Sequence, residues 1–234
     1  MASSARSHLR PLSADSLVEL AYGSIRQSIL AGEFKPGERL VESRIAAEME
    51  ISRAPVREAM QRLSQEGLTV EKPRRGNFVR EVNGKDFVDI YNTRIAIEST
   101  AVRLAVRNKA PLEPIQKTIE ALEKASRRGD VAKTVDLELK IHEQICEASD
   151  NQYIVMTFRS LAGPIQVALG MDDALYENLE DVATEHLPLL EAMRSGDADL
   201  AARTMESHIV STVGPVLERL GGDPADLLTQ AEEV

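Results

Sequence analysis

The chain has 234 residues, of which 43% are hydrophobic, 28% are charged and only 3% are aromatic, and its formal net charge is −10. This length suffices for two small domains with aliphatic cores. No apolar run approaches the roughly 18 residues that a membrane span needs, and residues 1–16 lack the apolar core of a signal peptide. We therefore expect a cytoplasmic protein without a membrane partner, and we expect its single cysteine, Cys146, to pack inside a helical core.

The negative charge is unevenly distributed along the chain. Residues 1–80 contain 13 Lys and Arg against 10 Asp and Glu, a balance of +3, whereas residues 81–234 contain 15 against 28, a balance of −13. Proteins that bind nucleic acids neutralise phosphates with Lys and Arg. The asymmetry therefore indicates that the first part of the chain can bind a polyanion and that the second part does not.

The order of elements in the first third of the chain is typical of a winged helix-turn-helix, which we assign to residues 12–82 after a disordered tail at 1–11. Apolar spacing predicts three helices followed by two short strands, at residues 17–30, 42–48, 53–66, 68–72 and 77–82. In this fold the third helix lies in the major groove of DNA, which is wide enough to accept an α-helix.

The third predicted helix and the hairpin turn carry the candidate DNA-binding residues. Arg53 and Arg57 are four residues apart and share one face of the helix, whose first turn Ser52 is expected to cap. Guanidinium groups there can bind guanine edges or phosphates, and the helix N-terminus also attracts phosphate. The alternative is that both arginines are solvated or pair with Glu50 or Glu58. Basic residues at the hairpin turn favour DNA binding, with these candidates: Ser52, Arg53, Ala54, Arg57, Arg74, Arg75 and Gly76.

This region resembles the DNA-binding signature of the GntR superfamily of transcription regulators. The matching motifs are Pro36-Gly37-Glu38-Arg39-Leu40, Glu42, Ile45-Ala46, the run from Ser52 to Ala59, and Gly67-Leu68. The resemblance implies a repressor or activator that binds a palindromic operator in double-stranded DNA as a homodimer. It also implies that Arg53 and Arg57 contact the operator and that the wing glycine, Gly76, enters the minor groove.

The second part of the chain predicts only helices, and we expect an all-helical bundle over residues 86–221 followed by a flexible acidic tail at 222–234. Glycine, proline and Asp-Asn breaks divide it into six helices, at residues 86–108, 112–128, 131–149, 151–169, 175–195 and 198–220. The expected fold class is mainly α, with an N-terminal winged helix-turn-helix and a C-terminal six-helix bundle.

Three of the four histidines fall in the predicted bundle. Glu138 and His142 are four residues apart and project from one face of a helix. His186 lies on the fifth predicted helix and His208 on the sixth, and the short turn at Gly196 makes these helices antiparallel neighbours. Three imidazoles and one carboxylate suit a divalent metal ion such as Zn, Ni, Mn or Fe. Each histidine taken alone could equally be a hydrogen-bonded core residue.

The same residues resemble the FCD ligand domain of the FadR-type branch of the superfamily. Its pattern is an acid followed four residues later by His, then Glu-His, then a final His, and this chain has Glu138 with His142, Glu185-His186 and His208. Glu138 replaces the usual Asp. Six helices imply the shorter form of the domain, in which a metal assists effector binding.

The resemblance also implies that Arg94 binds a small carboxylate effector, an organic acid or a sugar acid. The alternative for Arg94 is an ion pair with Glu98, one turn away on the same helix. The sequence thus predicts a DNA-binding regulator that responds to an acid through a metal-containing helical domain. A direct metal sensor is a second hypothesis. A metal-dependent enzyme is a third, but no general base or nucleophile is evident, and we do not expect an enzyme.

Overall fold

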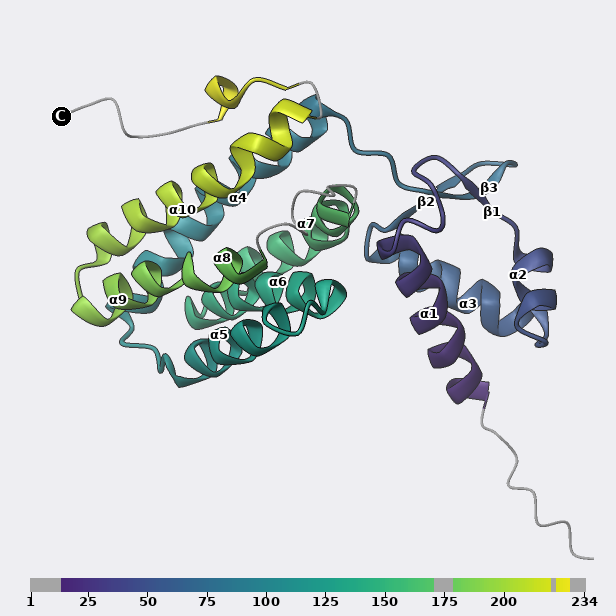
Figure 1. Ribbon diagram of the computed structural model, residues 1–234, viewed down its shortest axis with the longest axis horizontal. Helices are drawn as coiled ribbons and strands as arrows, with labels where there is room; N and C mark the ends of the chain where they lie inside the picture. Colours follow the sequence, from purple (N-terminus) through teal and green to yellow (C-terminus); the bar gives the residue numbers. More distant parts are fainter. Residues whose placement is uncertain (1–13, 171–178, 220–221, 228–234) are drawn as a thin grey trace, which may run out of the picture.

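In a computed structural model, residues 14–170, 179–219 and 222–227 can be described, and they form the two groups of elements seen in Figure 1. The N-terminal group has three helices, α1 (Ala14–Leu30), α2 (Glu42–Glu48) and α3 (Arg53–Gln65). Each helix turns an aliphatic stripe inward, and Ile25, Ile45 and Leu63 are buried there. The winged helix-turn-helix and the mainly α fold class are confirmed.

The wing is a three-stranded antiparallel sheet made of β1 (Arg39–Leu40), β2 (Thr69–Lys72) and β3 (Gly76–Val79) in the order β1-β3-β2. The sequence predicted β2 and β3 but not β1, because two residues are too few to show an alternating pattern. At the hairpin turn, Arg74 and Gly76 have positive φ angles of 62° and 94°. A glycine adopts this conformation without the steric cost of a side chain.

The C-terminal group contains seven α-helices within the described residues: α4 (Gly84–Arg107), α5 (Glu113–Ser126), α6 (Val131–Ala148), α7 (Gln152–Gly170), α8 (Leu179–Thr184), α9 (Leu187–Ser195) and α10 (Ala198–Arg219). The prediction of six helices was wrong in one place. The segment expected to be a single fifth helix is divided into α8 and α9 at Glu185-His186. Pro188 lies in the first turn of α9, where its missing N–H costs no hydrogen bond, whereas inside one continuous helix it would remove a hydrogen bond.

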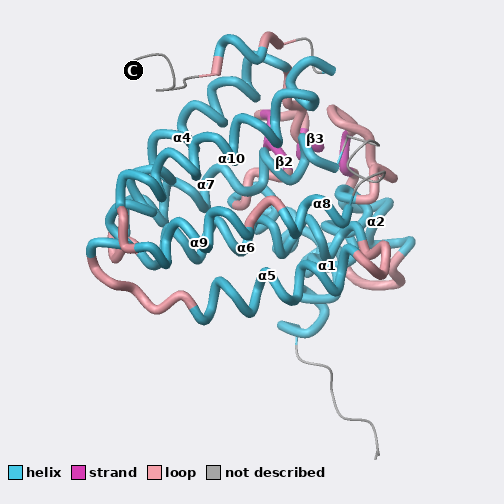
Figure 2. The backbone as a smooth tube through the Cα atoms, turned by 60° about the vertical axis from the view of Figure 1, so that its left-hand side comes forward, coloured by secondary structure: helices cyan, strands magenta, loops and turns pink. Residues whose placement is uncertain are grey.

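Helix α10 lies along α4, and α5 and α6 pack side by side on the other side of the bundle (Figures 1 and 2). A short 3₁₀ turn, Pro224–Asp226, follows α10. Asn92 of α4 donates a hydrogen bond to the carbonyl of Asp226 at 3.1 Å, and Leu227 is buried. This part of the segment that we expected to be a flexible tail therefore packs against the bundle. The remainder of that tail and residues 1–13 lie outside the described residues.

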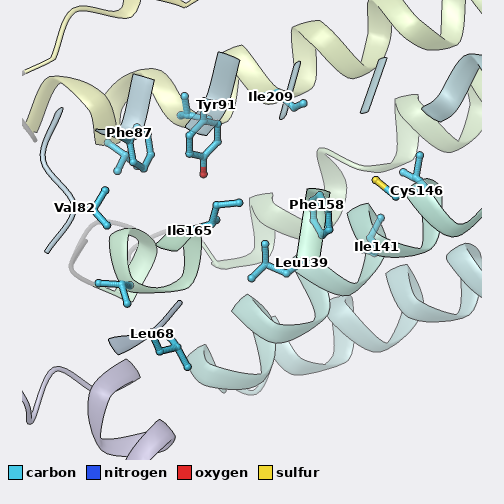
Figure 3. Packing of buried hydrophobic residues seen from close by; sticks show 14 of the residues in the cluster. Leu68, Val82, Phe87, Tyr91, Leu139, Ile141, Cys146, Phe158, Ile165 and Ile209 are labelled. Carbon is cyan, nitrogen blue, oxygen red and sulfur yellow. The ribbon is translucent and has the colours of Figure 1, made fainter. Parts of the chain in front are cut away.

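One buried hydrophobic cluster runs through both domains (Figure 3). It includes Leu68 of the winged helix, Ile165 of α7 and the aromatic pair of Phe87 and Tyr91, whose ring centroids are 4.3 Å apart. Cys146 is buried in the same cluster, as predicted. Within the described ranges, no helix is both long and apolar enough to cross a bilayer.

A close contact joins the end of α3 to α7. A Cβ atom at Gly163 would lie only 1.8 Å from the carbonyl oxygen of Glu66, and one at Gly67 would lie 2.8 Å from Cδ of Pro164. Gly163 therefore allows the two backbones to touch.

A polar bridge lies beside this contact. Arg26 of α1 donates to Oδ1 of Asp136 at 2.8 Å, and Gln166 of α7 donates to the same oxygen at 3.0 Å. Helix α1 is thus fixed to α6, and the end of α3 is fixed to α7. We call the two sets of contacts the interdomain joint: Arg26, Glu66, Gly67, Asp136, Gly163, Pro164 and Gln166.

Candidate functional site

The start of α3 presents a polar face to solvent. Ser52, Arg53, Ala54 and Arg57 are exposed, whereas Val56, one residue before Arg57, is buried in the core. Ser52 occupies the N-cap position, but its side chain accepts no capping hydrogen bond, so this part of the prediction was wrong. The Ser52 hydroxyl and the free N–H groups of the first helical turn remain available to an anion.

Arg57 does have a partner, although not one of the predicted glutamates. Its Nε and Nη2 donate to the carboxylate of Glu42, at the start of α2, over 3.1–3.3 Å. The Arg57 side chain stays 60% exposed, so the pair does not bury the guanidinium. The hydrogen bond to Glu42 raises the pKa of Arg57. Arg53 has no ion-pair partner among the described residues. The face therefore offers two guanidinium groups, one of which is oriented by Glu42.

The hairpin turn adds further positive charge. Arg74, Arg75 and Gly76 are all exposed at the turn between β2 and β3. Arg39 of β1 lies beside them, since a Cβ atom at Gly76 would be 3.6 Å from the Arg39 Nε. Arg39 was not predicted as part of this surface, because the two-residue strand β1 gives no periodic signal in the sequence. The wing is thus a cluster of three arginines around one glycine.

In the helical domain, His142, His186 and His208 come together as a buried cluster, each with one ring nitrogen within 4.8 Å of the others. They come from α6, from the N-cap of α9 and from α10. The Nε2 atoms of His142 and His208 are 3.3 Å apart. The interruption at Pro188 does not displace His186, whose Nδ1 donates to the carbonyl of Val182 at 2.7 Å and leaves Nε2 without a hydrogen.

Glu138 lies next to this cluster. Its Oε1 is 3.3 Å from the Nε2 of His142, while its Oε2 is buried and has no hydrogen-bond partner within the described residues. The Nε2 of His186 is likewise buried and without a partner in the part of the chain that the structure describes. Buried polar atoms normally have a partner, and a cation would supply one to both. The donor set of three imidazoles and a carboxylate therefore fits a divalent metal ion.

The electrostatics of the cluster favour neutral imidazoles at His186 and His208, whereas the charges of Glu98 and Glu138 outweigh burial and raise the pKa of His142. Burial, followed by the charge on His142, lowers the pKa of His186 to about 4. Burial and the other two histidines lower that of His208 to about 2. Burial raises the pKa of Glu138, but His142 and Arg94 outweigh this effect and bring it to about 2. Metal ligands must be deprotonated, so these three shifts prepare His186, His208 and Glu138 at neutral pH, and a bound cation would have to displace the proton that the carboxylates favour on His142.

Arg94 is buried on the α4 side of the cluster. Its Nε donates to Oε1 of Glu98 at 2.6 Å, the alternative that the sequence had left open, and its Nη2 is 4.0 Å from Oε1 of Glu138. The other oxygen of Glu98 accepts from Nδ1 of His142 at 2.5 Å. Burial raises the pKa of Glu98, but Arg94 and His142 lower it to about 2. The contact of Glu98 with His142 was not predicted, because the two residues are 44 positions apart in the chain.

A winged helix with exposed arginines, joined to a helical domain that encloses a polar cluster, defines a DNA-binding transcription regulator with an effector domain. Comparison with protein families identifies it further. Residues 17–79 match the gntR family of bacterial regulatory proteins, and residues 89–211 match the FCD domain. The chain belongs to the GntR family, in the branch that carries an FCD domain.

Relatives of known name are similar over most of their length. The chain is 28% identical over 199 residues to a probable D-xylose utilization operon transcriptional repressor of Paenarthrobacter nicotinovorans, covering 85% of this chain and 88% of that protein. It is 28% identical over 200 residues to the gluconate operon transcriptional repressor of Bacillus subtilis, covering 82% and 81%. The fold is similar to that of a GntR regulator from Rhodococcus sp. RHA1, with a TM-score of 0.73, 22% identity and coverage of 87% and 98%.

Proposed function

We propose that the protein is a cytoplasmic transcription repressor that binds a palindromic operator as a homodimer and is controlled by a small organic acid or sugar acid. Repressors of xylose and gluconate operons among its relatives support this class of effector. A dimer is expected because one helix and one wing read too few base pairs for useful specificity. The proposed DNA contacts are the exposed residues of α3 and the wing: Ser52, Arg53, Ala54, Arg57, Arg74, Arg75 and Gly76.

A divalent metal ion completes the proposed effector site, with His142, His186, His208 and Glu138 as its ligands. Zn, Ni, Mn and Fe all suit this donor set. The observation that supports it is the buried histidine cluster beside a carboxylate oxygen that has no partner. When bound, the metal supplies a positive charge that attracts the acid. Arg94 provides a second positive charge close by and is the proposed effector-binding residue.

The interdomain joint connects the helices that carry the proposed metal site to the DNA-binding domain. Helix α6 carries Glu138 and His142 and also Asp136, which holds Arg26 of α1. Helix α7 touches the end of α3 at Gly163. An acid that binds one arrangement of these helices more tightly than another shifts the population between them. By linkage, it changes the affinity of the two DNA-binding domains for the operator.

The proposal is tested by metal analysis and an acid screen. Protein purified without chelator should contain stoichiometric metal, and organic and sugar acids should raise its Tm more than that of chelated protein. His208→Ala should bind DNA near normally but lose the metal and the response to the acid. His8→Ala, which changes a histidine outside the described residues, is the matched control. Absence of stoichiometric metal would contradict the metal site.

A direct metal sensor is the second candidate function. It is favoured by the position of Arg94, which already pairs with Glu98 and lies near Glu138. A gel-shift titration with single metals and no organic acid separates the two candidates. A metal alone should alter operator affinity if the protein is a metal sensor, whereas the acid is required in addition if the first proposal is correct.

A further inference from the structure

Glu98 is the most deeply buried carboxylate beside the histidine cluster, and its side chain is 0% exposed. Both of its oxygens are used. Oε1 accepts from the Nε of Arg94 at 2.6 Å, and Oε2 accepts from the Nδ1 of His142 at 2.5 Å. A buried carboxylate remains charged only when it is paired, and Arg94 supplies the pairing charge. The carboxylate is therefore fixed from the α4 side and is directed at the ring of His142.

This contact determines which nitrogen of His142 faces the cluster. An ionised carboxylate only accepts hydrogen bonds, so the hydrogen of the neutral imidazole must be on Nδ1. The lone pair is then on Nε2, which is 3.3 Å from the Nε2 of His208 and 3.3 Å from the Oε1 of Glu138. The ring of Phe158 lies nearly parallel to that of His142, with 6.5 Å between the centroids.

The ring of His186 is also held by a hydrogen bond from its Nδ1, but the acceptor is a backbone carbonyl and not a carboxylate. Its Nδ1 donates to the backbone carbonyl of Val182 at 2.7 Å, and its Nε2 is the atom without a partner. Two imidazoles from different helices are therefore held through Nδ1 and present Nε2 to the same place. Metal-binding histidines commonly donate their second N–H to a carboxylate or a carbonyl, which fixes the tautomer and increases ligand basicity.

We propose that Glu98 is a positioning residue of the metal centre, which holds His142 in the Nδ1–H tautomer and aims its Nε2 at the metal. The inference rests on the proposed metal site and deepens it. Glu98 does not bind the metal itself, because both of its oxygens are already occupied by Arg94 and His142. Its contribution is to the affinity of the site, transmitted through one ligand.

The test is a Co²⁺ titration of metal-free wild-type protein, Glu98→Gln and Ser99→Ala. Glutamine keeps the size of the side chain but removes its charge, and metal affinity should fall about 10- to 100-fold. Ser99 is the matched control, because it is buried on the same helix and its hydroxyl bonds only to the carbonyl of Ile95. Ser99→Ala should bind Co²⁺ as the wild type does.

A second measurement separates positioning from general stability. At a pH where His142 is neutral, the imidazole ¹⁵N shifts of metal-free wild-type protein should report its Nδ1–H tautomer, and a folded Glu98→Gln variant should lose that preference. Wild-type protein that binds no Co²⁺ would contradict the proposed metal site. If a folded Glu98→Gln variant binds Co²⁺ with the same affinity as wild-type protein, the proposed role of Glu98 is overturned. If the variant does not fold, an Nε2–H tautomer of His142 in wild-type protein would overturn that role.

Discussion

The two domains each contain an arginine paired with a glutamate, and the two pairs differ in how far their side chains are exposed to solvent. Arg57 and Glu42 are 60% and 30% exposed and are joined over 3.1 Å at the surface of the winged helix. Arg94 and Glu98 are 3% and 0% exposed and are joined over 2.6 Å inside the bundle. Water screens the first pair, which leaves its guanidinium available to another anion. The second pair stays together because breaking it would leave a buried charge without a partner.

Burial therefore decides whether an arginine of this protein can bind an external anion or instead orients its neighbours inside a domain. The winged helix keeps its charges at the surface, where a polyanion can compete for them. The helical domain buries the charges of Arg94 and Glu98, where they orient each other and His142. Substitutions that remove one arginine from each pair should therefore act on different measurable quantities.

The largest expected effect is that of Arg94→Met. This variant leaves Glu98 buried with a single remaining partner, and the free energy of unfolding should fall by about 3–5 kcal/mol. Urea denaturation of metal-free protein measures it. The double variant Arg94→Met with Glu98→Leu should recover part of the loss, because it removes the buried charge as well. A loss below about 1 kcal/mol in the single variant would contradict the view that the buried pair is an obligatory unit.

Arg57→Ala should act on DNA instead of on stability. Loss of one guanidinium contact to a base should weaken operator binding roughly 10- to 100-fold, while urea denaturation and the oligomeric state remain unchanged. Footprinting and gel shifts measure the affinity. The matched control is Arg44→Ala, whose arginine pairs with Glu48 on α2. A normal footprint from Arg57→Ala would show that the start of α3 does not read the operator.

Gly163→Ala tests whether the two domains fold as one unit. The added methyl group would meet the backbone of Glu66, which cannot move as a side-chain end can. Such overpacking should cost about 1–3 kcal/mol of unfolding free energy and should make the unfolding of the two domains less cooperative. Differential scanning calorimetry gives both quantities. Gly214→Ala is the control, since nothing lies within 4 Å of its Cβ position. A single unchanged transition in Gly163→Ala would indicate that the contact at α7 is dispensable.

Arg26→Ala should have the smallest effect on stability, below about 1 kcal/mol, because Asp136 is partly exposed and keeps its bond from Gln166. Its effect should appear in regulation, as a smaller change in operator affinity when the effector or metal is added. Fluorescence anisotropy with labelled operator measures that change. An unaltered response would exclude this bridge from the coupling between the domains.

Much of the winged helix could be predicted from the sequence, because its signals are local. Apolar spacing, the glycine and proline breaks, and two arginines one helical turn apart all lie within a few residues of one another. The two-residue strand β1 was missed, and with it the position of Arg39 beside the wing glycine. A strand of that length exists only because β3 lies next to it.

The candidate metal site could be predicted only in part. The spacing of Glu138 and His142 places both on one face of α6, and their contact at 3.3 Å agrees with that expectation. The break before His186 was missed as a helix boundary although Pro188 marks it. The contact of Glu98 with His142 spans 44 residues and leaves no periodic signal.

The order of elements, the division of charge between the domains and the identity of the candidate ligands could be predicted from the sequence, since each depends on near neighbours in the chain. Tertiary structure alone decided that Glu42 orients Arg57, that Glu98 holds His142 and that Gly163 meets the end of α3. Such contacts depend on how helices rotate and cross when they pack, and that geometry is set by the whole core at once.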